Sequence, residues 1–299
     1  MLIDKLLAFP ICVFERTPCL HDSLIEATID LIEKFNQIKK HLKQNKLDAL
    51  EKHMLNLFIM NIIRGEDLGS YTYASITSQT VILPDFIRNI LNGCDFLTRE
   101  ILPDKENLGL LEIDNFILPL HKHLMNGLIT NPGKFSNQLR YTFDGTKIHN
   151  YPLFGTTELA EETLQTTIDS LNNMIFEIKT LQDKKQKLKC CLKFGSLLLS
   201  ALLNLHVFSD GNGRTIRLLL AYVMREVLPF YIFCGENRDD YLERIKMSKK
   251  FTPNVYFIND ARKLGTEILH QSPSILTEML VESAEKTMSE CFSYLYQQT

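Results

Sequence analysis

One stretch of the sequence combines a base, a carboxylate, glycines and arginines within twelve residues. It reads His206-Val-Phe-Ser-Asp-Gly-Asn-Gly-Arg-Thr-Ile-Arg217. Gly211 and Gly213 lack a Cβ atom, so the backbone there can adopt positive φ and a ligand can approach it closely. Backbone amides that lead into the first turn of a helix form an anion-binding site. These residue types at this spacing indicate phosphate chemistry.

The charged and titratable residues of this stretch each fit a role in that chemistry. Arg214 and Arg217 share one face at the start of the following helix, where cations are unfavourable unless an anion compensates for them. Asp210 is suited to hold Mg²⁺ against the same phosphates. His206 titrates near neutral pH and is suited to accept a proton from an attacking hydroxyl group. The simpler interpretation is a tight turn between two core helices, with His206 packed between them.

The full pattern H-x-F-x-[D/E]-G-N-G-R-x-x-R resembles the signature of the Fic (Fic/Doc) family. Every fixed position is present here, and a chance match has odds on the order of 10⁻⁸. Val207 stands where many members carry proline, but nothing in the chemistry requires a proline. The resemblance implies an all-α Fic-fold helical bundle with a small β-hairpin flap. Most members are nucleotidyltransferases that move AMP from ATP onto a hydroxyl side chain of a target protein.

The resemblance assigns a role to each site residue. His206 is the expected catalytic base for a Ser, Thr or Tyr hydroxyl of the target. Asp210 is expected to bind the cofactor Mg²⁺, which bridges the α- and β-phosphates of the co-substrate ATP. The remaining phosphate oxygens are expected to bind Gly211, Asn212, Gly213, Arg214 and Arg217. Tyr241 is expected beside the nucleotide base, although an ordinary core aromatic residue is an equally good interpretation.

A hairpin pattern precedes the motif in the chain. The turn signal Asp144-Gly145 is flanked by apolar and aromatic residues, namely Tyr141, Phe143, Ile148 and Tyr151. By resemblance this hairpin is the flap that docks the modifiable segment of the target, through Lys147, Ile148 and His149. From the sequence alone, a surface hairpin without a role is an equally good interpretation.

The composition favours a globular protein of one large or two modest domains. The chain has 299 residues, of which 45% are apolar and 23% charged. The formal net charge of −3 argues against a general nucleic-acid or anionic-membrane surface. Seven cysteines without a C-x-x-C pair indicate reduced, buried thiols in a cytoplasmic compartment, rather than disulfides or a zinc site. The sequence predicts no segment of membrane-spanning length.

We expect three regions: an N-terminal helical region over residues 1–105, a Fic catalytic core over 106–265 and a C-terminal helical extension over 266–299. Residues 159–188 are predicted to form one long amphipathic helix, whose final lysines suit a helix C-terminus. Residues 190–205 and 214–228 are predicted to be the two apolar helices at the centre of the bundle. The Lys-, Asn- and Ile-rich composition suits an AT-rich bacterial genome, and an effector or toxin delivered into a host cytosol is one such setting.

Alternatives to AMP transfer stay open. In relatives the same loop transfers UMP, phosphocholine or phosphate, or removes the modification. An alternative of another class is a nucleotide-responsive interaction module with marginal turnover, in which the helical first third of the chain binds a partner.

The sequence also leaves open how the activity is inhibited. Many Fic proteins carry an inhibitory helix with the pattern [S/T]-x-x-x-E-[G/N], whose glutamate pairs with the second arginine. Two pairs match its first half, Thr157 with Glu161 and Ser274 with Glu278, but Glu162 and Met279 occupy the final position. We therefore keep two interpretations: self-inhibition through Glu278 and Arg217, and a separate inhibitor protein. The oligomeric state is not predicted.

Overall fold

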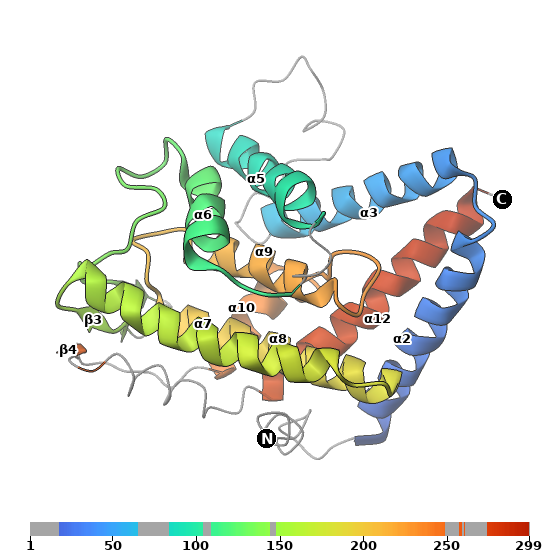
Figure 1. Cartoon of the computed structure of the whole chain (residues 1–299). Helices are drawn as coiled ribbons and strands as arrows, with labels where there is room; N and C mark the ends of the chain where they lie inside the picture. Colours follow the sequence, from blue (N-terminus) through green and yellow to red (C-terminus); the bar gives the residue numbers. More distant parts are fainter. Residues whose placement is uncertain are drawn as a thin grey trace.

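In the computed structural model, helix α8 (Lys184–Leu205) is the central element. Most of its residues are buried, because α7 (Thr157–Lys179), α9 (Asn212–Met224) and α12 (Ser274–Gln297) pack around it (Figure 1). Gly195 allows a close approach, since a Cβ atom there would lie 2.8 Å from Leu220 Cδ1 of α9. The structure describes residues 18–64, 84–103, 109–143, 148–248, 257–258, 260 and 274–298.

The other elements follow in chain order. The N-terminal helices are α2 (Pro18–Lys39) and α3 (Gln44–Arg64). Helix α5 (Asp85–Phe96) continues into the π-helical turn η1 (Leu97–Ile101). A second π-helical turn, η2 (Ile113–Ile117), leads into α6 (Leu118–Met125). Strands β1 (Tyr141–Phe143), β2 (Ile148–Asn150) and β3 (Leu153–Phe154) precede α7, and α9 is followed by α10 (Arg238–Ser248) and β4 (Phe257–Ile258). The all-α class with a small hairpin is confirmed.

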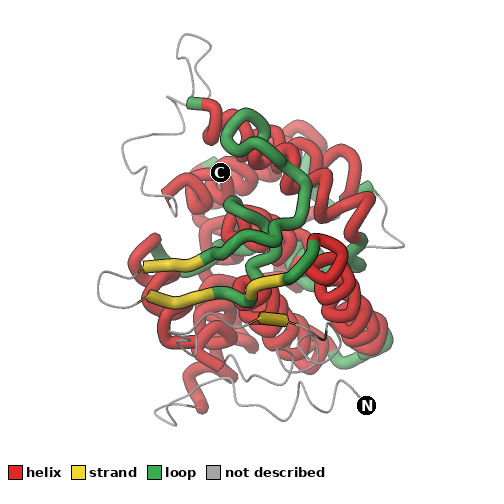
Figure 2. Tube along the Cα trace, turned by 90° about the vertical axis from the view of Figure 1, so that its left-hand side faces the viewer, coloured by secondary structure: helices red, strands yellow, loops and turns green. Residues whose placement is uncertain are grey.

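The predicted hairpin is present and lies across one face of the helical body (Figure 2). Its strands β1 and β2 are antiparallel, with Tyr141 opposite Asn150 and Phe143 opposite Ile148. The predicted turn at Asp144-Gly145 and the flap residue Lys147 lie outside the described residues. Strand β3 pairs in parallel with β4.

Residues 159–188 do not form the single helix that the sequence predicted. Helix α7 ends at Lys179 and α8 begins at Lys184. Asp183 explains the new start, because its Oδ1 accepts a hydrogen bond from the backbone N–H of Gln186 at 2.6 Å and caps α8.

The lysines of this segment therefore lie in the first turns of α8, and their predicted role at a helix C-terminus is wrong. They pair with acidic side chains, chiefly of α2: Lys184 with Glu33, Lys185 with Glu26, Lys189 with Asp22, and Lys187 with Glu226 after α9. Exposed pairs of this kind contribute little stability. Their effect is to orient α2, which also packs along α12 (Figure 1).

Helix α8 is long and apolar enough to span a membrane by length and composition, the one such helix in the described part of the chain. The prediction that no segment has this length does not hold for α8. Because 89% of its apolar window is buried by other helices, α8 is explained as the core helix of the fold. The cysteines among the described residues with described side chains (Cys94, Cys190, Cys191, Cys234 and Cys291) are free and buried, as predicted.

Candidate active site

His206 ends helix α8 in a left-handed backbone conformation, with φ 48° and ψ 51°. It is the single non-glycine residue with positive φ among those the structure describes. This conformation costs an L-residue roughly 1–2 kcal/mol, and glycine or asparagine usually takes it at the end of a helix. A histidine held in a strained conformation suggests that its side chain is needed there.

The imidazole ring of His206 is partly buried and stacks on the ring of Tyr151. The ring centroids lie 3.7 Å apart and the planes differ by 11°. Tyr151 is itself buried, and its hydroxyl shares a hydrogen bond of 2.7 Å with Thr142 Oγ1 of β1. The base of the hairpin therefore sets the plane of the His206 ring. Sequence reasoning placed Tyr151 beside the turn but did not connect it with His206.

The motif loop, residues 206–211, joins α8 to α9 and is closed by Asn212. The Asn212 amide accepts from the Phe208 backbone N–H at 3.1 Å and donates to the Phe208 carbonyl at 2.9 Å. Asn212 is buried. Its side chain is thus engaged within the loop, and the predicted contact with phosphate falls to its backbone amide.

His121 of α6 holds the motif loop in place through hydrogen bonds of its ring. Its Nδ1 accepts a hydrogen bond from the Gly133 backbone N–H at 2.8 Å, so Nε2 carries the proton and donates to the Asp210 carbonyl at 2.9 Å. The ring is fully buried and stacks on Phe208, with centroids 3.8 Å apart. Burial lowers the pKa of His121 to about 4, which keeps the ring neutral near pH 7. The sequence offered one signal for this role, a titratable residue on the apolar face of a predicted helix.

Phe208 anchors the loop. Its buried ring also lies parallel to that of Phe135, with centroids 5.9 Å apart. One further backbone contact, from the Ser136 N–H to the Val207 carbonyl at 2.9 Å, ties the segment before the hairpin to the motif loop. The loop is therefore held by contacts on its inner side.

The two glycines of the motif differ in their surroundings. Gly211 has φ +76°, and a Cβ atom there would lie 2.3 Å from Met125 Sδ, so only glycine fits. Around the Cβ position of Gly213, no atom of the described residues outside its own helix turn lies within 4 Å. Gly213 follows Asn212 at the start of α9, where backbone N–H groups have no partner within the helix. The open side of the loop is therefore a helix N-terminus that a phosphate can approach.

Asp210 presents its carboxylate at this open side. The side chain is 67% exposed, its Oδ1 accepts from the Gly211 N–H at 2.6 Å, and its Oδ2 lies 3.7 Å from Arg214 Nη2. One exposed carboxylate beside a helix N-terminus fits Mg²⁺, which usually takes one or two carboxylates together with phosphate oxygens and water.

Arg217 is buried beneath α3, a contact that the sequence did not reveal. Its Nη1 donates to the Ile62 carbonyl of α3 at 3.2 Å and its Nε to the Gly213 carbonyl at 3.3 Å. The guanidinium carbon lies 5.4 Å from the centroid of the Tyr241 ring. Tyr241 is buried and its ring packs against the guanidinium of Arg217. Its contact with a nucleotide base stays a prediction.

The flap residues face in different directions. Ile148 is 51% exposed, whereas His149 is buried with its ring edge-on to Tyr151, 4.9 Å between centroids. Buried Arg140 fixes the base of the hairpin by donating to the carbonyls of Ser136 and Pro152. Ile148 thus remains available to a target, and His149 supports the stack that holds His206.

Glu278, the residue weighed for self-inhibition, lies in α12. Its Oε1 is 3.4 Å from His21 Nε2. The hydrogen bonds described for Arg217 go to backbone carbonyls. Restraint by Glu278 stays a prediction.

Comparison with known proteins points to one family. Residues 113–224 match the model of the Fic/DOC family. The chain is 31% identical over 191 residues to the ribonucleoside-diphosphate reductase small chain of Ostreid herpesvirus 1 (isolate France), covering 63% of this chain and 29% of that protein. It is 29% identical over 102 residues to the protein adenylyltransferase Fic of Aedes aegypti, covering 33% of this chain and 20% of that protein. The chain thus spans less than a third of either relative.

The fold is similar to that of a solved structure, Fic-1 from C. elegans. The TM-score is 0.66 at 16% sequence identity, and the match covers 94% of this chain and 74% of that one. At this identity the likeness concerns the fold.

Alanine substitutions at the two glycines are expected to have opposite effects. Gly211→Ala adds left-handed strain and a clash with Met125, together roughly 2–4 kcal/mol of lost stability. Gly213→Ala lies in open space within the first turn of α9 and is expected to be neutral or slightly stabilising. Denaturant unfolding of the two variants measures the difference. Equal midpoints for both would contradict the described loop geometry.

The folded-state pKa of His121, about 4, is below the ordinary value of 6.5. The unfolded chain therefore binds more protons between these values, and stability falls as pH drops from 6.5 towards 4. The contribution is at most about 1.4 kcal/mol per pH unit. In His121→Gln, which keeps a donor and an acceptor but does not titrate, we expect a shallower loss of stability over this range. Unfolding midpoints at several pH values test this, and parallel curves for the two proteins would show that His121 is not the buried neutral group.

Proposed function

We propose that this chain, which belongs to the Fic/DOC family through residues 113–224, transfers AMP from ATP to a hydroxyl side chain of a protein. A Fic-type transferase is the broader assignment that the family supports. The choice of AMP rests on the name of the Aedes aegypti relative and on the chemistry of the loop. Because this relative aligns over only 33% of the chain, the activity, target and partners of the whole protein are part of the proposal.

The observation that carries the proposal is the strained backbone of His206. Its left-handed φ ends α8 shortly before α9 begins, and its partly buried imidazole has its ring plane held by Tyr151. A turn that served only to join two helices would be more stable with glycine at this position. A retained histidine is consistent with a general base positioned for its substrate.

The phosphates of ATP are proposed to bind the open side of the loop. The amides at the start of α9 supply donors, and Gly213 leaves room for a close approach. Arg214 is largely buried with its guanidinium near Asp210, so its orientation is set before the ligand binds. Arg217 lies deeper, between α3 and Tyr241, and is assigned to the terminal phosphates. Asp210 would hold Mg²⁺, which when bound neutralises phosphate charge.

The proposed reaction uses the side chains as follows. His206 takes the proton from a Ser, Thr or Tyr hydroxyl of the target as the oxygen attacks the α-phosphorus of ATP. The bond from the α-phosphorus to the oxygen bridging to the β-phosphate breaks, and pyrophosphate leaves with the electron pair. AMP remains on the target oxygen as a phosphodiester. The protein contributes positioning and stabilisation of charge, which are the main terms in such transfers.

The flap is proposed to hold the target. Leu139, Tyr141 and Ile148 are more than half exposed, an apolar edge beside the Tyr151–His206 stack. A segment of the target laid along this edge would bring its hydroxyl towards His206. Lys147, at the turn, is the further predicted contact and lies outside the described residues.

Labelled nucleotides distinguish this proposal from its alternatives. Lysate proteins incubated with the chain and ATP labelled at the α-phosphate are expected to acquire label. ATP labelled at the γ-phosphate is expected to give no label beyond that in lysate without the chain. If label is transferred only from α-labelled UTP, the transferred group is UMP. If it is transferred only from labelled CDP-choline, the group is phosphocholine. Nucleotide binding without any label would favour the interaction module.

His206→Gly separates stability from activity. Glycine removes the left-handed strain but loses the stack on Tyr151, and we expect a net change in stability within about 1 kcal/mol. Transfer is expected to fall roughly 10²–10⁴-fold because the base is lost. His53→Ala, which removes a histidine stacked on Tyr294, is the control and should label at the parental rate. Near-normal labelling by His206→Gly would remove His206 from the mechanism.

A further inference from the structure

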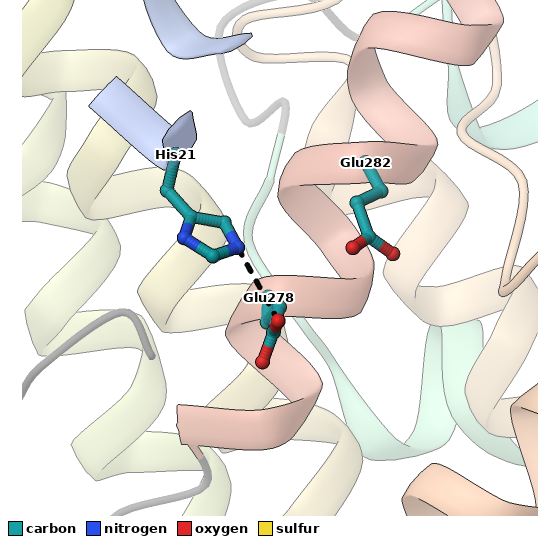
Figure 3. Close-up of side chains that lie close together, drawn as sticks. All are labelled: His21, Glu278 and Glu282. Carbon is teal, nitrogen blue, oxygen red and sulfur yellow. Dashed lines mark ion pairs between the residues drawn. The ribbon is translucent and has the colours of Figure 1, made fainter. Parts of the chain in front are cut away.

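A second cluster of possible ligands lies outside the candidate active site, where the starts of α2 and α12 meet. It consists of His21, Glu278 and Glu282 (Figure 3). One ligand atom from each residue lies within 4.8 Å of the other two. The closest described approach is 3.4 Å, between His21 Nε2 and Glu278 Oε1.

The arrangement is favourable for a bound ion. Glu278 and Glu282 are one helical turn apart on α12, so both carboxylates lie on one face, and the His21 ring approaches them from α2 (Figure 3). His21 is only 4% exposed, and Nε2 is the ring nitrogen that faces Glu278 (Figure 3). The carboxylates are more open, at 21% exposed for Glu278 and 43% for Glu282, which leaves an entry path.

One carboxylate of the cluster is held by a neighbouring cation. Arg244 of α10 binds Glu282 Oε2 and Asp240 Oδ1, each at 2.7 Å. The Glu282 carboxylate is thereby oriented on α12, one turn from Glu278.

We propose that His21, Glu278 and Glu282 bind a divalent transition-metal ion, with Zn²⁺ as the ion that the donors suit best. Zn²⁺ accepts imidazole nitrogen and carboxylate oxygen, and three protein ligands leave its fourth position to water. Arg244 needs one oxygen of Glu282, so the other can face the ion. Arg244 then acts as the outer partner that orients a ligating carboxylate.

The proposed ion is structural. It joins the first turns of α2 to α12, and Arg244 extends the connection to α10, which carries Tyr241 beside Arg217. We therefore expect the ion to raise the thermal stability of the chain, and neither the chemistry at His206 nor the Mg²⁺ assigned to Asp210 depends on it.

Zn²⁺ titrated into the full chain, after metals are removed with a chelator, tests this site. Calorimetry is expected to show one Zn²⁺ bound per chain and an increased Tm. Glu278→Gln and Glu282→Gln keep the side-chain shape and are each expected to weaken binding at least about 10–100-fold. Glu285→Gln, on α12 but outside the cluster, and Asp210→Asn, in the other proposed metal site, should bind Zn²⁺ like the parent.

Co²⁺ provides a readout that does not depend on folding energy. The parent chain loaded with Co²⁺ is expected to show a visible d–d absorption band that both cluster variants lose and both controls keep. Two results would overturn the proposal. One is a parent chain that binds no stoichiometric Zn²⁺, which leaves His21 and Glu278 as an ion pair only. The other is undiminished Zn²⁺ affinity in both cluster variants.

Discussion

A neutral imidazole buried between α6 and the motif loop makes two hydrogen bonds that together require one tautomer. His121 accepts from Gly133 and donates to the carbonyl of Asp210, while its ring stacks on Phe208. These two bonds fix the spacing between the segment before the hairpin, which contains Gly133, and the motif loop, which contains Asp210. Asp210 lies on the motif loop, and the segment held through Gly133 leads into the hairpin that Tyr151 follows. The relative positions of the carboxylate and the His206 stack therefore depend in part on this one side chain.

The motif loop divides its contacts between an inner and an outer side. The side chains of Asn212 and Phe208 are used within the fold, and Met125 fills the space beside Gly211. The Asp210 side chain is exposed, and a Cβ atom added at Gly213 would meet no described atom outside its own helix turn within 4 Å. A loop that is rigid on one side and open on the other suits catalysis by positioning, since little reorganisation accompanies the reaction. The strain at His206 is tolerated because this surrounding structure is well packed.

The sequence predicted the helical fold, the hairpin and the motif because their signals are local. The hairpin, for example, was predicted from the turn signal Asp144-Gly145 and its apolar and aromatic flanks. The break before α8 was missed although Asp183 and Gln186 carry a capping signal, since the lysines beyond it suggested a helix end. The contacts of His121 with Asp210 and of Arg217 with Ile62 join residues 89 and 155 positions apart, and no periodicity reports them. The contact between His21 and Glu278 also joins residues far apart in the sequence, and no periodicity reports it.

A crystal structure of the chain with Mg²⁺ and a non-hydrolysable ATP analogue tests the central claim most directly. We expect the α-phosphate beside His206, the following phosphates at the amides that begin α9, and the metal on Asp210. A nucleotide bound elsewhere would contradict the assignment. The groove of about 900 Å³ between α5 and α6, whose lining includes Asn92, Lys122 and Lys134, is one such place. A triphosphate in that groove with an empty motif loop would leave His206 without a substrate.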